Sequence, residues 1–242
     1  MQTILITGAS RGIGAALARE FAAHGYSLAL NCRQQTDALE HLAQELRETY
    51  HIPILTCVGN VGDPAFVREL FDRTSREIGP VSILINNAGI SHIGLLQDMS
   101  YEQWRTVMNT NTDSVFLCCK HAIPDMLSRG HGYILNISSV WGNMGASCEC
   151  AYSASKGAVN AFTKALAREL APSGITVNAI ACGAVDTDMN ACFSPEERAA
   201  LEQEIPCGRY GTPQEVASLA YQLVNSGSYL TGQIITLDGG WT

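Results

Sequence analysis

The sequence predicts a doubly wound α/β fold, in which a single seven-stranded parallel sheet carries helices on both of its faces. Short apolar segments alternate with longer amphipathic segments along the whole chain, which is the order of strands and crossover helices. The short segments are nearly continuous apolar runs, as is typical of parallel strands that are buried on both faces. A glycine-rich turn directly follows the first of them, where this class of fold binds nucleotides.

The predicted strands are the short apolar segments, which lie at Ile4–Thr7, Ser27–Cys32, Ile54–Val58, Ser82–Asn86, Tyr133–Ile137, Thr176–Ala181 and Ile234–Leu237. The longer amphipathic segments between them are the predicted helices, at Ile13–His24, Asp37–Thr49, Pro64–Ile78, Tyr101–Ser128 and Ala151–Leu170, with two shorter helices after Pro195 and Pro213. No Ser/Gly-rich linker and no change of composition divides the chain, so we expect one domain over residues 1–242.

Composition and charge limit the possible function. Hydrophobic residues make up 46% and charged residues 16% of the chain, which is the balance of a globular protein with a sizeable core. The net charge of −8 argues against a nucleic-acid partner, because such proteins normally present a basic face. No run of eighteen apolar residues and no basic segment ahead of the first strand is present, so we expect neither a membrane span nor a signal peptide.

The nine cysteines are odd in number and irregularly spaced, and no C-x-x-C pair occurs. This pattern favours reduced thiols in a cytoplasmic protein. Cys148 and Cys150 could ligate a metal ion, but no histidine or second cysteine pair lies at a suitable spacing, so we expect no metal site. The part played by Cys148, Cys150 and Cys182 stays open.

The segment Thr7–Gly14 reads T-G-A-S-R-G-I-G and joins the first strand to the first helix. Glycines permit a tight turn and let the backbone approach a pyrophosphate, and the following helix offers its free N–H groups to the phosphates. A simple strand–helix connector is the alternative interpretation, although it does not require three glycines. The residues expected to bind the cofactor here are Gly8, Ser10, Arg11, Gly12, Ile13 and Gly14.

The end of the second strand indicates which nicotinamide cofactor is bound. An acidic residue there would bind the ribose 2′-hydroxyl of NAD and repel a 2′-phosphate. The segment instead reads Asn31-Cys32-Arg33, and Arg33 and Arg11 are both placed to meet a 2′-phosphate through the planar guanidinium group. We therefore expect NADP(H) as the cofactor, with Asn31 and Arg33 in its site, while a solvated loop charge is the alternative reading of Arg33.

Polar residues that could perform catalysis follow the fourth and fifth strands and open the next helix. Asn87, Ala88 and Gly89 come after the fourth strand, and Ser139 comes after the fifth, where an open parallel sheet holds its ligands. Tyr152 and Lys156 are four residues apart on a helix, so they share one face. Such a spacing is common by chance, and it is the combination with the glycine turn and Ser139 that gives it weight.

The chemistry of these side chains fits carbonyl reduction. A tyrosine phenol has an unperturbed pKa of about 10. The ammonium of Lys156, together with a nicotinium charge in the oxidised complex, would favour the phenolate and lower this pKa. Tyr152 could then donate a proton to a carbonyl oxygen as hydride arrives, or accept it in reverse, and Ser139 could hydrogen-bond the same oxygen.

With these motifs the sequence resembles the short-chain dehydrogenase/reductase family across essentially its whole length. The matching motifs are T-G-x-x-x-G-x-G at Thr7–Gly14, N-N-A-G at Asn86–Gly89, the serine at Ser139 and Y-x-x-x-K at Tyr152–Lys156. The resemblance implies an NADP-dependent oxidoreductase in which Ser139, Tyr152 and Lys156 are catalytic. It also implies that Asn111 is the fourth catalytic residue and holds a water that links the lysine to a proton relay, with Asn109 as the nearby alternative.

The same resemblance implies further cofactor contacts. Tyr152 and Lys156 would also bind the nicotinamide ribose, Asn60 and Val61 would contact the adenine, and Asn87, Ala88 and Gly89 would line the site. After the sixth strand, Gly183, Val185 and Thr187 match the nicotinamide side of the family's site. Cys182 replaces a proline that the family usually has, which implies a less rigid loop than in the family pattern. Residues from about 188 to 210 would form a lid over the substrate.

Within the family, the sequence is similar to 3-oxoacyl-[acyl-carrier-protein] reductases, which implies reduction of a 3-oxoacyl thioester in fatty acid biosynthesis. It also resembles a narrower set, the elongation factor P 5-aminopentanone reductases, so acyl carrier protein and elongation factor P are both candidate partners. The candidate substrate contacts are Ser139, His92, Trp141, Met144, Glu149 and Met189. Core packing is an equal interpretation of most of these residues, and Glu149 could instead complement the dipole of its helix.

A function of another class, a non-catalytic NADP-binding sensor or scaffold, would not require the serine, tyrosine and lysine that are all present here. Assembly is expected as well, because the long helices at Tyr101–Ser128 and Ala151–Leu170 carry much apolar surface, including Val115, Phe116, Leu117 and Phe162. In the resembling family these helices pair between subunits, which implies a dimer or a homotetramer with dyad symmetry.

Overall fold

The computed structural model of the chain describes residues 2–191 and 193–242 and confirms the predicted fold class. Within these residues one parallel sheet has the strand order β3-β2-β1-β4-β5-β6-β7. The strands are β1 (Thr3–Ile6), β2 (Ser27–Cys32), β3 (Ile54–Val58), β4 (Val81–Asn86), β5 (Gly132–Ser139), β6 (Ile175–Cys182) and β7 (Ile234–Leu237). The chain changes its direction along the sheet between β1 and β4, and ligands of doubly wound folds bind at such a switch point.

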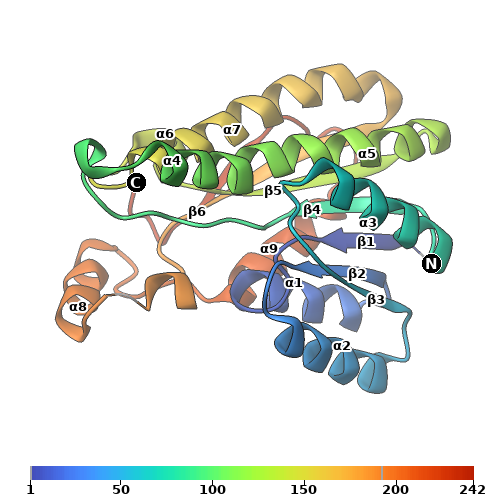
Figure 1. Cartoon of the computed structure of the whole chain (residues 1–242), viewed down its shortest axis with the longest axis horizontal. Helices are drawn as coiled ribbons and strands as arrows, with labels where there is room; N and C mark the ends of the chain where they lie inside the picture. Colours follow the sequence, from blue (N-terminus) through green and yellow to red (C-terminus); the bar gives the residue numbers. More distant parts are fainter. Residues whose placement is uncertain (1, 192) are drawn as a thin grey trace.

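The helices cover both faces of the sheet (Figure 1). One face is covered by α1 (Gly12–Ala23), α2 (Thr36–Tyr50) and α9 (Pro213–Val224). The other face is covered by α3 (Pro64–Glu77), α5 (Ser114–Arg129) and α7 (Cys150–Leu170). Three further helices are α4 (Tyr101–Met108), α6 (Trp141–Met144) and α8 (Pro195–Glu204), of which α8 projects away from the layers in Figure 1.

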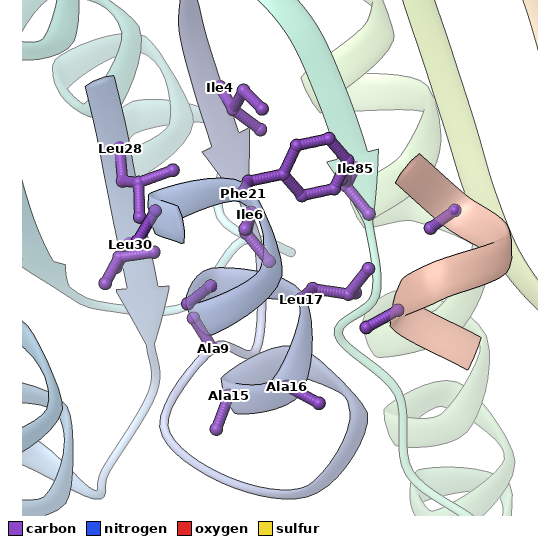
Figure 2. Packing of buried hydrophobic residues seen from close by; sticks show 14 of the residues in the cluster. Ile4, Ile6, Ala9, Ala15, Ala16, Leu17, Phe21, Leu28, Leu30 and Ile85 are labelled. Carbon is purple, nitrogen blue, oxygen red and sulfur yellow. The ribbon is translucent and has the colours of Figure 1, made fainter. Parts of the chain in front are cut away.

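Strand β1 shows how the sheet is packed on both sides. Ile4 and Ile6 belong to the core on the side of α1, whereas Leu5 belongs to the core on the side of α5, because successive side chains of a strand point to opposite faces. Phe21 and Leu17 of α1 pack over the first of these faces (Figure 2). All five side chains are fully buried, so the sheet is a firm base for the loops at its carboxyl edge.

The predicted helix at Tyr101–Ser128 contains a feature that periodicity does not reveal. It consists of α4 and α5 joined by a π turn, η2 (Asn109–Asp113). Four single-turn segments are also absent from the prediction, because they are too short to show a period: α6, η1 (Leu96–Asp98), η3 (Ala171–Ser173) and η4 (Asp188–Asn190). Cys192, one of the cysteines expected to be reduced, lies outside the described residues.

Candidate active site

A cleft of about 940 Å³ opens at the carboxyl ends of the strands. The loops after β1, β2, β3, β4, β5 and β6 all line it, together with the segment that leads into α8. The cleft therefore lies where the strand order and the sequence motifs predict it, and its size is that of a pocket for a cofactor-sized molecule.

Thr7 and Asn87 join the glycine turn to the loop after β4. The Thr7 hydroxyl oxygen accepts hydrogen bonds from the backbone N–H groups of Asn87 and Ala88, both at 3.0 Å. The side-chain amide of Asn87 donates in turn to the backbone carbonyls of Thr7 and Gly8, both at 2.9 Å. Two motifs that are 80 residues apart in the sequence thus form one hydrogen-bonded unit.

Glycine is required in this turn because a side chain has no room. A Cβ atom on Gly14 would lie 2.1 Å from the carbonyl oxygen of Gly8, and one on Gly8 would lie 2.9 Å from the Cα atom of Ala88. Gly8 and Gly12 also have φ angles of +65° and +53°, which favour glycine. Helix α1 begins at Gly12 and so directs its free N–H groups into the cleft. Bare backbone beside a helix N-terminus fits a pyrophosphate, and a simple connector would not need it.

Two arginines lie at the end of the cleft that is formed by β1 and β2. Arg33 is exposed and lines the cleft, and no ion pair involves it within the part of the chain that the structure describes. Arg11 precedes α1 and also lines the cleft, but its guanidinium contacts the carboxylate of Asp188 at 3.2 Å. Ser10 and Ile13, the other predicted contacts of this turn, line the cleft as well.

Asn31 has a structural role that the sequence does not reveal. It is only 1% exposed, and its side-chain amide donates to the backbone carbonyls of Cys57 and Gly59, both at 3.1 Å. It therefore ties the carboxyl end of β2 to that of β3, although it still borders the cleft. Asn60 and Val61, which follow β3, line the same end of the cleft, and the family resemblance implies that they contact the adenine.

The loop after β6 brings three predicted residues to the opposite wall, where Gly183, Val185 and Thr187 line the cleft. Gly183 is confined by the C-terminal segment, since a Cβ atom on it would lie 2.7 Å from the Cβ atom of Asp238. Thr187 reaches over the glycine turn, and its methyl group would lie 3.2 Å from a Cβ atom on Gly12. This loop therefore covers the turn that we expect to hold phosphates.

Ser139, Tyr152 and Lys156 converge on the floor of the cleft. Ser139 is the last residue of β5, and Tyr152 and Lys156 lie one turn apart in the first part of α7. The ammonium of Lys156 donates a hydrogen bond of 2.8 Å to the carbonyl of Ile137 and lies 5.6 Å from the centre of the Tyr152 ring. The side chains of Tyr152 and Ser139 are hydrogen-bonded to each other.

Burial dominates the electrostatics of this floor. It raises the pKa of the Tyr152 hydroxyl above its usual range, and the hydrogen bond with Ser139 acts in the opposite direction without overcoming it. It also lowers the pKa of Lys156 to about 8. We expected Lys156 and a nicotinium charge together to lower the tyrosine pKa, but the protein's own groups have the opposite effect because desolvation penalises the phenolate. A neutral phenol beside an ammonium is a proton donor.

Asn111 connects the loop after β4 to α7. It lies in the π turn η2 and is 1% exposed. Its side-chain oxygen accepts from the N–H of Ile90, and its amide donates to the Ile90 carbonyl and to the Ser155 hydroxyl, all at 2.9 Å. Ser155 donates to the carbonyl of Tyr152 at 2.7 Å. Asn109, the alternative in the sequence, bonds the loop after β3 instead, so Asn111 is the asparagine that contacts the floor.

The structure divides the predicted substrate contacts into two groups. Trp141, Glu149 and Met189 line the cleft. His92 and Met144 do not line it. Met144 ends the short helix α6 and is 63% exposed, while His92 lies between two residues that do face the cleft.

Further wall residues were missed by the sequence analysis, among them Trp241 and Ser91. Trp241 lines the cleft, and its ring packs edge-on against Trp141 with 4.9 Å between the ring centres. Asp238 fixes this segment by accepting hydrogen bonds from the backbone N–H groups two and four residues later. Ser91 donates to the carboxylate of Glu149 at 2.5 Å. No local pattern marks Trp241 or Ser91, because each acts through a partner that is distant in the sequence.

The predicted lid, residues 188–210, lies along one side of the cleft and contributes Met189, Phe193 and Leu201 to its lining. Arg198 of α8 connects the predicted lid to the loop after β6 and also packs on a residue of the lid itself. Its guanidinium contacts Asp186 at 2.9 Å and lies 4.3 Å from the centre of the Tyr210 ring.

The cysteines of interest are free thiols. Cys182 pairs in register with Ser139 on the neighbouring strand and lines the floor of the cleft, and burial raises its pKa to about 12. It is therefore a neutral group beside the catalytic candidates. Cys148 and Cys150 lie beside Glu149, and in residues 2–191 and 193–242 no three His, Cys, Asp or Glu side chains are grouped to hold a metal ion. None of the described helices is both long and apolar enough to span a membrane.

Comparison with known proteins connects this geometry to a family. Residues 2–198 match the sequence model of the family described as short chain dehydrogenase. The chain is 39% identical over 241 residues to the Uncharacterized oxidoreductase YmfI of Bacillus subtilis, covering 99% of this chain and 98% of the relative. It is 38% identical over 237 residues to the 3-oxoacyl-[acyl-carrier-protein] reductase FabG of Escherichia coli, covering 98% of this chain and 95% of the relative.

Solved structures show the same architecture. A gluconate 5-dehydrogenase from Burkholderia cenocepacia, in complex with NADP and tartrate, matches with a TM-score of 0.93 and 32% identity over 99% of this chain and 94% of that chain. A short-chain type dehydrogenase/reductase from Mycobacterium marinum matches with a TM-score of 0.94 and 35% identity over 100% of this chain and 95% of that chain.

Proposed function

The chain belongs to the short-chain dehydrogenase family, and from that premise we propose that it is an NADPH-dependent reductase of a 3-oxoacyl thioester. One observation carries the proposal. Ser139, Tyr152 and Lys156 converge on the floor of a cleft that also contains the glycine turn and Arg33. A proton donor and a phosphate-binding turn in one cleft are the two parts that a nicotinamide-dependent reductase needs.

The residues present fit NADP(H). The glycine turn and the start of α1 leave room and N–H groups for the pyrophosphate, while Arg33 and Arg11 offer guanidinium groups to a 2′-phosphate. The residues that follow β2 are Arg33-Gln34-Gln35, and none of them is acidic. An acidic residue there would favour NAD(H) by binding its free ribose 2′-hydroxyl. When bound, the nicotinamide supplies the hydride for reduction or accepts it in the reverse reaction.

The protein's own groups handle the proton. Tyr152 donates its phenolic proton to the carbonyl oxygen, and Ser139 donates a hydrogen bond to that oxygen as negative charge develops there. The ammonium of Lys156 stabilises the phenolate that remains, at a site where Ile137 fixes its position. Asn111 acts through Ser155 and Ile90, which hold the floor and the loop after β4 in place.

A second candidate substrate is an amine-bearing ketone carried on a protein, as in the 5-aminopentanone modification of elongation factor P. The charge of the cleft favours this candidate. Glu149, Glu197 and Glu204 all line it, whereas the phosphopantetheine of an acyl carrier protein is itself anionic. Names of relatives support the thioester, since several are 3-oxoacyl-[acyl-carrier-protein] reductases at 36–38% identity.

NADPH oxidation with an acetoacetyl thioester, followed at the nicotinamide absorbance with NADH as the control, tests the proposal. Rapid turnover with NADPH and slow turnover with NADH is the expected result. Tight NADPH binding without turnover would overturn the thioester and direct the assay to modified elongation factor P. NADPH binding without turnover of either substrate or of a simple ketone would favour the sensor or scaffold class.

We propose in addition that the chain forms a dimer or a homotetramer, with the long helical segments α4–α5 and α7 at the interface. The structure changes which residues support this idea. Val115 and Leu117 are buried in the chain's own core, so the expected contribution from them was wrong. Phe116 is 51% exposed and Tyr101 is 71% exposed, and these remain for a partner subunit. Light scattering should give a multiple of the 26.0 kDa chain mass, and a monomeric mass would refute the assembly.

A further inference from the structure

One ion pair connects the glycine turn to the lid. The guanidinium of Arg11, at the start of α1, contacts the carboxylate of Asp188 in η4 at 3.2 Å, although the residues are 177 positions apart. Both side chains line the cleft, and their exposed fractions are 61% and 64%. Nearby, Thr187 leans over Gly12. The pair therefore spans the cleft directly above the turn that we expect to hold the cofactor phosphates.

The partner of Arg11 in this pair is chemically similar to the ligand proposed for it. A carboxylate and a phosphate both accept hydrogen bonds from the same N–H groups along the edge of a guanidinium. A carboxylate beside Arg11 also repels a second anion that approaches the same group. Because the pair is exposed to solvent, it contributes little stability, so a phosphate can replace the carboxylate of Asp188 as the partner of Arg11 at a low energetic cost.

We propose that Asp188 determines how tightly the protein binds NADPH relative to NADH, by competing with the 2′-phosphate for Arg11. The inference rests on the proposed cofactor. NADH lacks the 2′-phosphate, so it leaves the ion pair in place. NADPH draws Arg11 away from Asp188 and thereby releases one attachment between the lid and the glycine turn. Asp188 is thus a positioning residue that acts through Arg11.

An acid in the loop after β6, just ahead of the predicted lid, serves as a matched control. Asp186 is two residues away, is similarly exposed at 58%, and pairs with Arg198 of α8 at 2.9 Å. It does not line the cleft. Asp186→Asn removes the same charge two residues away without releasing Arg11, so it reports the general effect of negative charge in this part of the chain.

The test is direct measurement of the dissociation constants of NADPH and NADH by calorimetry, on the full chain and without substrate. Asp188→Asn is expected to tighten NADPH binding by about two- to fivefold, the range that an exposed ion pair supports, and to change NADH binding little. Asp186→Asn should leave the dissociation constants of both NADPH and NADH nearly unchanged. The gain should shrink in 0.5 M NaCl, because salt screens exposed charges.

A double-mutant cycle completes the test. In an Arg11→Gln background, Asp188→Asn should lose its selective effect on NADPH, because the shared guanidinium is gone. Equal tightening for both cofactors would show a general field effect and overturn the inference. Weaker NADPH binding in Asp188→Asn would also overturn it, since the acid would then be holding Arg11 in its binding position. No preference for NADPH in the unmodified chain would overturn the cofactor proposal together with this inference.

Discussion

The floor of the cleft and its proposed lid are held by different kinds of interaction. On the floor, Lys156, Asn111 and Ser155 are buried, and hydrogen bonds to backbone and hydroxyl groups fix them. On the lid, Asp188 and Arg198 are at least one-third exposed and are held by ion pairs.

This difference separates two tasks. Buried hydrogen bonds hold groups in one geometry, and they do not respond to salt because water and ions do not reach them. Exposed ion pairs break at small cost, so a segment held by them can move while the floor stays unchanged. Chemistry is therefore expected to depend on the floor, and affinity and access on the lid.

The strongest way to break this comparison is Tyr152→Phe. Loss of the proton donor should lower kcat by roughly 10²- to 10⁴-fold and leave the NADPH dissociation constant nearly unchanged. Tyr133→Phe is the control, because Tyr133 is a buried tyrosine of β5 whose hydroxyl bonds Asn178 away from the floor. Turnover retained in Tyr152→Phe would remove Tyr152 from the catalytic role.

Asn111→Ala tests whether the floor depends on its hydrogen bonds. Ile90 and Ser155 lose their partners, so the unfolding free energy should fall by about 1–3 kcal/mol in urea denaturation. Displacement of α7 should also lower kcat by roughly tenfold to a hundredfold. Asn109→Ala, which breaks the bond to Gly62, should reduce stability and spare kcat. Equal kcat values for the two variants would contradict the special role of Asn111.

The pH dependence follows from Lys156. Its pKa of about 8 means that the ammonium is lost as pH rises through that value. The rate constant kcat/KM for reduction should therefore fall above about pH 8, by about tenfold per unit once the group is mostly neutral. Stability should change in the opposite direction. A folded-state pKa below 10.5 means that burial of the charged Lys156 costs stability, and this cost falls as pH rises from about 8 to 10.5. In the Lys156→Met variant the free energy of unfolding, measured by urea denaturation at a series of pH values, should not show this rise.

The smallest effect is expected on the lid. Arg198→Gln removes the contacts with Asp186 and with the ring of Tyr210. It should raise the substrate KM by about two- to threefold and leave kcat unchanged. Arg19→Gln, which breaks an exposed pair with Glu45 between α1 and α2, is the matched control. A large loss of kcat in Arg198→Gln would show that lid and floor are not separate.

Most of the fold could be predicted from the sequence because its signals are local. Apolar strands, amphipathic helices and the turn at Thr7–Gly14 each leave a pattern within a few residues. The candidate site was predictable where a family motif marks it, as at Ser139 and Tyr152. The placement of Trp241 beside Trp141 was not, because a contact between the C-terminal segment and α6 has no local pattern.

The direction of the Tyr152 pKa could not be predicted for a related reason. The sequence shows that Lys156 is one helical turn away, but it does not show how far the phenol is removed from water. The pairing of Arg11 with Asp188 is similar, since two oppositely charged residues far apart in the sequence carry no sign of their contact. Burial and long-range pairing are properties of the folded chain.

The π turn at Asn109–Asp113 constrains how this chain can vary in length. A π turn holds one more residue per turn than an α-helix, and it places Asn111 toward Ile90 and Ser155. Deleting one residue there would restore a regular helix and rotate everything that precedes it by about 100° relative to α5. Substitutions along the outer face of α4 and α5 leave this geometry intact, whereas a single insertion or deletion does not. Among natural variants, this stretch should therefore change in sequence far more readily than in length.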